Sequence, residues 1–513
     1  MKHQIKVITT AIYIIISITI AQGCHTSPPP GYVTIEDGHF SIDGEPWFPL
    51  MINYKAKIAQ VGDSLEVVPI DYYNGDCIAE HFDTIAQWGF NSVRICLDVI
   101  EKRPDNQSMY RATERMIKKA EKSGLRVMLL IKPPFDSYWR TYTKGLLAHL
   151  SDQPALWAYD FFNEPLYFDS EKERSKNEVI TIVTEWKSMA KEQAPHQLFT
   201  IATAEPIETF EWDPSMLPVD FIEMHTYHPL RVKSEMWWYS KYSGKPWMIG
   251  ETGLPADGDS IPYEWQSLFL KETFAYAKSL GAIGYGWWEF QDCPNGVNFE
   301  AQWTGMRDQQ GNRKPCVKEI KKLYSIKTHS TPEPPVNYYN MLAYENLSVT
   351  GTVVDSSGHP IEGAVIRGWN NNWSIGINTY SKPNGTFQLI SNDICTHFWI
   401  SSTRHSKTAI DTTPIYETSE PLNNTDREYQ IIDYTKFMPT SGILPTDATH
   451  FNPKNIPTFS IGIITLTEIP TNHKQLQRIS YKKMKGKQTH PTITSCLQNK
   501  YPPKIIQCAT SAT

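Results

Sequence analysis

Two glutamates that follow apolar segments could work as a pair in acid–base chemistry. The run LWAYDFFN (156–163) is followed by Glu164 and Pro165, and the run PWMIG (246–250) is followed by Glu251. Pro165 cannot donate to a strand ladder, so we expect the strand to stop there and Glu164 to project from its end. When two carboxyl groups face each other, one can act as a protonated acid and the other as an ionised nucleophile, provided that their surroundings hold their pKa values apart. Cleavage of a glycosidic bond requires such a pair.

Side chains with complementary chemistry end other apolar segments. A guanidinium at Arg94 could keep a neighbouring carboxylate ionised. The phenol of Tyr227, two residues after His225, could donate a hydrogen bond to the nucleophile and orient it. Asn163 suits the 2-hydroxyl of a sugar, a contact that strengthens in the transition state. The indole of Trp288 could stack on the sugar ring.

Several residues compete for these roles. Glu205 and Glu289 also follow apolar segments and are alternative acids. His225 and His228 could bind a metal ion, but no third ligand with suitable spacing is evident, and the absence of a CxxC motif argues against a thiolate metal site. We expect neither a metal nor an organic cofactor. Lys132 ends another apolar run and could turn inward, towards a charged substituent of a substrate, or outward to solvent. No G-x-S-x-G motif is present, which argues against ester hydrolysis.

The elements that must position these residues alternate between short apolar runs and amphipathic segments. Continuous apolar runs separated by helices are typical of a parallel sheet that is buried on both faces. Eight such units within residues 31–326 predict a (β/α)8 barrel, in which the carboxyl ends of the strands surround the active site. A doubly wound sheet is the alternative, but no glycine-rich phosphate loop follows the first run. Asp-Gly pairs at 37–38 and 43–44 predict a hairpin before the barrel. The apolar runs cover residues 48–53, 91–96, 126–131, 156–162, 198–202, 220–225, 246–251 and 282–288.

A different pattern begins after a proline-rich linker at residues 327–345. Residues 346–468 alternate apolar and polar side chains between turns rich in Gly, Asn and Pro, which predicts a small all-β sandwich. Residues 469–513 contain eight Lys or Arg and no Asp or Glu. This composition predicts a disordered tail or, alternatively, a segment that binds an anionic surface.

Residues 1–23 are typical of an export signal. Lys2, His3 and Lys6 precede an apolar run at residues 7–20, which is too short for a comfortable membrane span. Small residues then lead to Cys24, as in bacterial lipoproteins, in which this cysteine carries the lipid. We therefore expect a protein anchored by lipid to a bacterial cell-envelope membrane, either periplasmic or surface-exposed. A cleaved signal with an incidental cysteine is the alternative.

Composition bounds the partners of the chain. Its 513 residues carry a formal charge of −6, so nothing recommends nucleic acid as a partner. The 16 Trp and 26 Tyr suit either a well-packed core or a flat-ring ligand such as a carbohydrate. Export would expose the chain to an oxidising compartment, where Cys77 could pair with Cys96, or Cys293 with Cys316.

The ordered set of strand-end residues resembles the clan A glycoside hydrolases and is most similar to the cellulase-type family five. The resemblance covers residues 31–326 and implies a retaining glycosidase that cleaves β-glycosidic bonds of a poly- or oligosaccharide by double displacement. It implies Glu164 as the acid/base and Glu251 as the nucleophile. It departs at Lys132, where many family members carry a histidine. The residues that it places in substrate binding are Arg94, Asn163, His225, Tyr227 and Trp288.

Residues 346–468 contain the string G-x-V-x-D-x-x-G-x-P-I-x-G-A-x-V, which resembles the carboxypeptidase-regulatory-like module, usually an accessory domain.

The competing function is a surface lipoprotein that binds a glycan on the same barrel without cleaving it. The sequence specifies neither the sugar nor the linkage.

Overall fold

The computed structural model describes residues 29–70, 77–99, 105–171, 173–296, 298–326, 347–369, 376–391, 395–411 and 458–469. The predicted export signal at residues 1–23, Cys24, the predicted linker at residues 327–345 and residues 470–513 of the predicted basic tail lie outside these ranges. Within the described ranges, no helix combines the length and the apolar character needed to cross a membrane.

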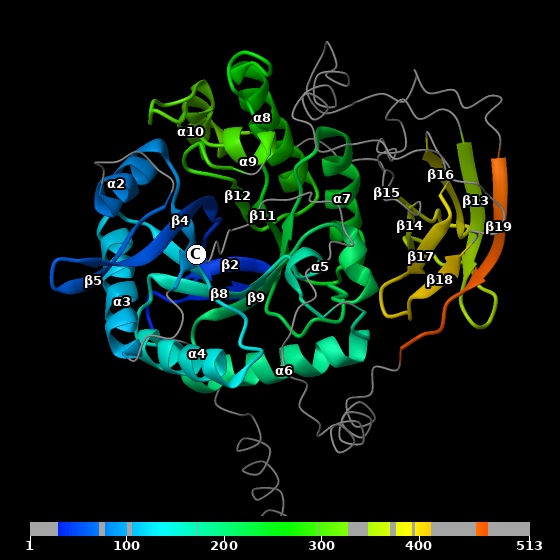
Figure 1. Ribbon diagram of the computed structural model, residues 1–513, viewed down its shortest axis with the longest axis horizontal. Helices are drawn as coiled ribbons and strands as arrows, with labels where there is room; N and C mark the ends of the chain where they lie inside the picture. The colour runs from blue at the N-terminus through cyan, green and yellow to red at the C-terminus, as the bar shows by residue number, and fades with distance from the viewer. Residues whose placement is uncertain are drawn as a thin grey trace, which may run out of the picture.

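Eight parallel strands close into a barrel (Figure 1). Neighbouring strands follow chain order, and β12 pairs back with β4, so the ring is closed. β4 continues beyond the barrel and forms an antiparallel hairpin with β5 (Ser64–Pro69). The predicted (β/α)8 barrel is therefore confirmed. The barrel strands are β4 (Leu50–Val61), β6 (Ser92–Asp98), β7 (Arg126–Leu130), β8 (Leu156–Asn163), β9 (Leu198–Thr203), β10 (Ile222–His225), β11 (Trp247–Glu251) and β12 (Tyr285–Trp287).

Helices surround the barrel, and local sequence signals set their ends (Figure 1). The longest helix, α6, begins with a capping box in which Ser175 and Glu178 each accept a hydrogen bond from the backbone N–H of the other. After α3, Gly124 adopts φ +78° and donates its N–H to Glu121 O over 2.8 Å, the geometry with which glycine ends a helix. The helices and 3-10 turns are α2 (Ile78–Trp88), α3 (Asn106–Lys122), α4 (Ser137–Leu150), α5 (Pro165–Phe168), α6 (Lys176–Gln193), η1 (Pro206–Phe210), α7 (Pro229–Tyr242), α8 (Tyr263–Ser279), α9 (Phe299–Trp303), η2 (Pro315–Glu319) and α10 (Ile320–Leu323).

A small antiparallel sheet closes the amino-terminal end of the barrel. Its first turn uses Asp37 and Gly38 at φ +49° and +78°, the paired left-handed geometry of a two-residue hairpin turn. Phe40 is fully buried and meets the rings of Trp157 and Phe221 edge-on, with ring centres 5.1 and 5.0 Å apart. Because those two residues lie at the starts of β8 and β10, the rings plug this end of the barrel. The strands of this sheet are β1 (Val33–Glu36), β2 (His39–Ile42) and β3 (Glu45–Pro46).

Two further sheets follow the barrel and pack face to face. One has the order β16-β13-β19 and the other β15-β14-β17-β18. Val353, Ile366, Phe398 and Ile464 are buried between them. The predicted all-β domain after the barrel is therefore confirmed. Its strands are β13 (Leu347–Val354), β14 (Val365–Trp369), β15 (Gly376–Tyr380), β16 (Thr386–Ser391), β17 (His397–Ser401), β18 (Thr408–Asp411) and β19 (Thr458–Thr465).

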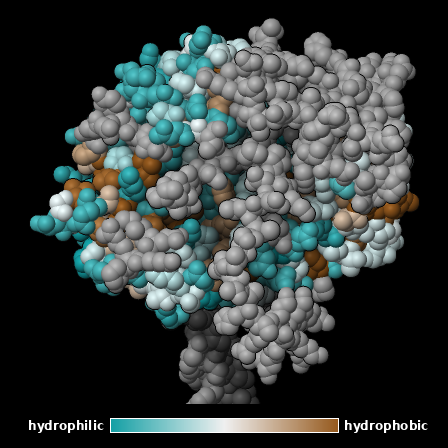
Figure 2. Space-filling view, in the orientation of Figure 1, coloured by the Kyte–Doolittle hydropathy of each residue, from teal (hydrophilic) through white to brown (hydrophobic). Residues whose placement is uncertain are grey.

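This sandwich packs directly against the barrel. Val365 belongs to the same hydrophobic cluster as the barrel core, and Tyr380 and Trp399 pack against that cluster. The indole of Trp238, on α7, donates to Gly363 O over 2.8 Å. On the face of the molecule that Figure 2 shows, the described surface is mixed, with teal hydrophilic areas beside brown apolar patches at the left and right.

Neither candidate disulfide forms. The Cys316 thiol donates to Gln266 Oε1 over 3.1 Å inside the barrel domain. Cys77 lies exposed at the start of α2, whereas Cys96 is buried in β6.

Candidate active site

Glu164 and Glu251 are both held at the carboxyl end of the barrel. Glu251 is the last residue of β11, and Glu164 follows directly after β8. The Glu164 N–H donates to Ala202 O of the neighbouring strand β9 over 2.8 Å. Its backbone is left-handed, with φ +43°, which turns the chain out of the strand before Pro165 starts α5. Both side chains are almost fully enclosed, since Glu164 is 3% exposed and Glu251 2%.

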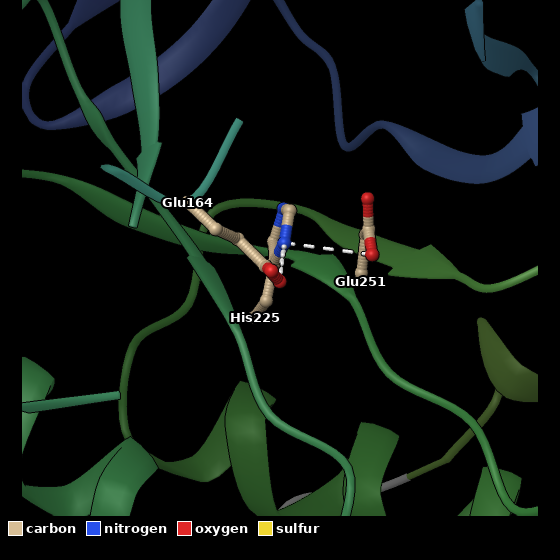
Figure 3. Close-up of side chains that lie close together, drawn as sticks. All are labelled: Glu164, His225 and Glu251. Atoms are coloured by element: carbon tan, nitrogen blue, oxygen red, sulfur yellow. Dashed lines mark hydrogen bonds and ion pairs between the residues drawn. The ribbon is translucent and has the colours of Figure 1, made fainter. Parts of the chain in front are cut away.

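The two carboxyl groups meet at His225, the last residue of β10 (Figure 3). His225 Nδ1 lies 2.7 Å from Glu164 Oε1 and 3.5 Å from Glu251 Oε2. One ligand atom from each of the three residues lies within 4.8 Å of the other two. The structure thus brings together three residues that lie 61 and 26 positions apart along the chain.

Arg94 links this pair to the inside of the barrel. Its guanidinium is fully buried and donates from Nη1 to Glu251 Oε1 over 2.6 Å and to Asn53 Oδ1 over 2.9 Å. From Nη2 it donates to Asp160 Oδ2 over 2.6 Å and to Asn163 Oδ1 over 2.8 Å. Since Asn163 uses its carbonyl oxygen for Arg94, its amide N–H groups can serve another acceptor.

A further carboxyl group lies beneath these residues. Glu223 Oε1 is 3.1 Å from Arg94 Nε and 3.8 Å from His225 Nε2. The room for this side chain comes from Gly250, because a Cβ at that position would lie 2.2 Å from Glu223 Oε1. The Gly-Glu pair that ends β11 is therefore a spatial requirement of the site.

Sequence interpretation missed Asn53, Asp160 and Glu223. All three are fully buried polar side chains within barrel strands. The available signal was a polar or charged residue inside an otherwise apolar strand, because a buried polar or charged group needs a partner. Glu223 also lies two residues before His225, a spacing that places both side chains on one face of a strand.

Tyr227 and Trp288 complete the wall beside the nucleophile candidate. The Tyr227 hydroxyl donates to Glu251 Oε2. Both rings belong to a small apolar cluster with Cys96 and Ala301. Burial and the neighbouring carboxylates Glu251 and Glu164 raise the pKa of Tyr227 well above its usual value, so the phenol stays a donor.

Electrostatics separate the roles of the charged groups. Burial raises the pKa of Glu164, although the hydrogen bond from His225 opposes this shift. Burial lowers the pKa of His225, but the carboxylates Glu251, Glu164 and Glu223 outweigh burial and raise it to about 10. The ring is therefore a cation at neutral pH, and Nδ1 donates to Glu164. Glu164 in turn keeps its proton to higher pH than an exposed glutamate.

Both alternative acids are paired with cations. Glu289 Oε1 lies 3.4 Å from the Lys55 ammonium. Glu205 pairs with Arg231 and accepts a hydrogen bond from the Tyr167 hydroxyl over 3.0 Å. Neither belongs to the cluster around His225.

Lys132 lies beside an aromatic ring. Its ammonium is 5.7 Å from the centre of the Trp139 ring, within the range of a cation–π interaction. Part of its charge is therefore engaged by an indole at the start of α4.

The described residues that could approach a metal ion together are Glu164, His225 and Glu251. This set differs from the histidine pair considered from sequence, because two carboxylates replace His228. In the structure, His225 Nδ1 lies against Glu164 and Glu251, and Nε2 lies 3.8 Å from Glu223 Oε1.

Comparison with known proteins gives likeness in fold only. No protein-family model matches the sequence, and no curated protein matches it. An exo-beta-1,4-mannosidase from Opitutaceae bacterium strain TAV5 superposes with a TM-score of 0.45 at 19% identity over 57% of this chain and 62% of the mannosidase. A GH5_18 protein from Streptomyces cattleya in complex with GlcNAc gives 0.41 at 16% over 54% and 78%, and a beta-glucuronidase from Ruminococcus gnavus gives 0.42 at 16% over 58% and 53%. This chain thus spans less than two thirds of the mannosidase.

Proposed function

We propose that this chain is a retaining glycoside hydrolase that cleaves β-glycosidic bonds of a poly- or oligosaccharide. One observation carries the proposal: carboxyl groups from the ends of β8 and β11 approach within 4.8 Å of each other around His225. Retaining enzymes place their two carboxyl groups about 5–5.5 Å apart, whereas inverting enzymes need about 6.5–9.5 Å for a water between them. The shorter separation supports direct attack by a carboxylate.

In the first step, Glu164 donates a proton to the leaving oxygen while Glu251 attacks the anomeric carbon. The bond from the anomeric carbon to the leaving oxygen breaks, and a bond to a Glu251 oxygen forms. Glu164 Oε1 is held by His225, whereas Glu164 Oε2 has no hydrogen-bond partner among the described residues. Oε2 is therefore the oxygen available to carry the proton. Arg94 and Tyr227 each donate a hydrogen bond to Glu251 and hold its side chain in place.

In the second step, water hydrolyses the glycosyl-enzyme. Glu164, now ionised, takes a proton from the water as its oxygen attacks the anomeric carbon, and Glu251 leaves as a carboxylate. Asn163 can donate to the sugar 2-hydroxyl in both steps, since its carbonyl is already engaged by Arg94. Trp288 offers a ring face for stacking. These roles agree with the resemblance to family five of clan A.

The experiment that tests this function is digestion of a glycan panel, with the product anomers followed by NMR. We expect new reducing ends whose first-formed anomer is β, and no product from Glu251→Gln. If the parent chain binds a glycan but releases no reducing ends, the protein is instead a non-catalytic glycan-binding protein. An α-anomer as first product would refute the retaining mechanism.

We also propose export and lipid anchoring at Cys24 to a bacterial envelope membrane. The support is the apolar run at residues 7–20 followed by small residues and this cysteine. Labelling of cells with an alkyne analogue of palmitate should mark the parent chain and not Cys24→Ala. Equal labelling of both would refute the anchor.

A further inference from the structure

We propose that the β-sandwich positions the acid/base Glu164 through a relay that runs from Asn378 to Glu205 and then to Tyr167. This inference rests on the proposed function, because it assigns a task at the same site. It makes Asn378, Glu205 and Tyr167 positioning residues. It also gives the sandwich a part in catalysis that a detachable spacer would not have.

The register of the sandwich sheet turns one face towards the barrel. Ile366 of β14 points into the sandwich core, whereas its neighbour Val365 lies in the hydrophobic cluster of the barrel. Side chains alternate between the two faces of a strand, so Arg367 shares the face of Val365. Across the ladder, Arg367 pairs with Asn378, and Val365 pairs with Tyr380. Arg367 and Asn378 therefore face the barrel as neighbours.

At this face, Asn378 reaches a buried carboxylate of the barrel. Its Nδ2 donates to Glu205 Oε2 over 3.2 Å, while its Oδ1 accepts from Arg367 Nη1 over 3.0 Å. The arginine thus fixes which end of the amide faces Glu205. Burial raises the pKa of Glu205, but Arg231 and Arg367 outweigh burial and lower it below the usual value. A carboxylate that is both buried and ionised depends on each of its donors.

The other oxygen of Glu205 holds the segment that follows Glu164. Glu205 Oε1 accepts from the Tyr167 hydroxyl over 3.0 Å. The Tyr167 N–H in turn donates to Glu164 O over 2.9 Å, and the Phe168 N–H donates to the same oxygen over 3.1 Å. The N–H of Leu166 donates to Glu208.

The backbone of Glu164 needs this support. Its φ of +43° is a left-handed conformation that a residue with a side chain adopts only where its surroundings hold it. Loss of a donor to Glu205 should loosen Tyr167, and with it the short helix α5. The acid would then spend less time in the position that protonates the leaving oxygen.

The interface offers a matched control. Lys241 Nζ and Glu362 Oε1 form an ion pair 2.5 Å apart between α7 and the sandwich, with no contact to Glu205. Glu362→Gln therefore weakens the same interface without touching the relay. Asn378→Leu removes the amide that donates to Glu205 at similar volume. Tyr167→Phe breaks the relay from the barrel side, and keeps the test available if Asn378→Leu fails to fold.

The first measurement exploits leaving-group dependence. We would assay each variant on 2,4-dinitrophenyl and on methyl β-glycosides of whichever sugar the parent cleaves. Dinitrophenolate leaves without a proton, so only the methyl glycoside needs the acid. We expect Asn378→Leu and Tyr167→Phe to lose about tenfold or more in kcat/KM on the methyl glycoside and less than about twofold on the dinitrophenyl glycoside, because kcat/KM reports the first step, in which Glu164 acts as the acid. The double variant should lose no more than the worse single variant.

Equal losses on both substrates, or the same pattern in Glu362→Gln, would overturn the positioning role. A second measurement needs no activity: amide hydrogen exchange of residues 164–168 in the full chain should rise several-fold in Asn378→Leu and stay unchanged in Glu362→Gln. Unchanged exchange in Asn378→Leu refutes the relay. A parent chain that cleaves no glycoside refutes the proposed function, and the exchange result still decides the relay.

Discussion

The two ends of the barrel use the same eight strands for opposite purposes. At the amino-terminal end, Phe40, Trp157 and Phe221 fill the barrel with packed rings. At the carboxyl end, Arg94 and His225 hold the carboxyl groups that surround them. Strand β8 takes part in both, because it starts near Trp157 and ends before Glu164. The amino-terminal end is therefore built by packing of apolar rings, whereas the carboxyl end is built by pairing of charged groups.

Because of this difference, substitutions at the two ends should affect different properties of the protein. Removal of ring volume from the plug leaves a cavity, and the cost appears in the free energy of unfolding. Removal of one carboxylate charge from the site leaves its volume filled, and Arg94 and His225 keep other carboxylate partners, so the cost should appear mainly in the rate. Substitutions at the two ends should accordingly separate stability from catalysis.

The largest expected effect is that of Glu251→Gln. Loss of the proposed nucleophile should lower kcat on the order of 10⁴-fold or more, about 5.5 kcal/mol in the barrier. The amide keeps the side-chain volume, so the midpoint of denaturant unfolding should change little. Steady-state kinetics and a guanidinium titration of the same preparation check both statements. A variant that unfolds readily but retains its rate would reverse the assignment of the two ends.

Glu164→Gln should be nearly as severe, but only where the leaving group needs a proton. We expect a loss of about 10²–10⁴-fold on methyl glycosides and much less in the first step with dinitrophenyl glycosides. The pH profile gives a second measure. Because burial raises the pKa of Glu164, the parent should keep its acid up to that pKa and lose kcat/KM as the pH rises through it. In Glu164→Gln this alkaline decline should vanish, and its persistence would point to another acid.

Phe40→Ala should show the opposite pattern at the plug. Deletion of a fully buried phenyl ring costs about 3–5 kcal/mol of unfolding free energy. At temperatures well below the transition, kcat/KM should equal that of the parent, because the ring lies at the far end of the strands. Phe40→Leu serves as the milder control. A large loss of kcat without loss of stability would show that the two ends are coupled.

The plug and the barrel illustrate what the sequence could predict. Apolar runs and Asp-Gly turns depend on local rules of periodicity and turn chemistry, so the barrel and its hairpin followed from them. Glu164, His225 and Glu251 were predicted as site residues because each comes at the end of an apolar run, and the structure places them together. The two glutamates lie together around the His225 imidazole because the barrel strands close into a ring.

The buried partners were harder to predict. Asp160 and Glu223 lie within strands, and their role depends on which face of the strand points inward. A register shift between Asp160 and Asn163 interrupts the simple alternation in β8. Likewise, Glu205 and Glu164 both follow strands, and their different partners distinguish them: Glu205 meets Arg231 and Asn378, whereas Glu164 meets His225. Contacts between distant segments decide these cases, and they leave no local pattern.

The smallest and sharpest test deletes one hydroxyl at each of two places. Tyr227→Phe removes the donor that positions Glu251 Oε2, and misplacement of a reacting group can cost about 10²-fold, so kcat should fall about 10- to 100-fold. Tyr285→Phe is the matched control: its hydroxyl lies 2.7 Å from Thr273 Oγ1, between β12 and α8 and away from the site. Its loss should cost about 1 kcal/mol of stability and leave kcat unchanged. Because each variant loses one hydroxyl oxygen, kinetics and denaturant titration of both variants compare directly what that oxygen contributes to kcat and to stability at the two places. If Tyr285→Phe lowered kcat as much as Tyr227→Phe, the carboxyl end would not be the separate electrostatic region inferred from its contacts.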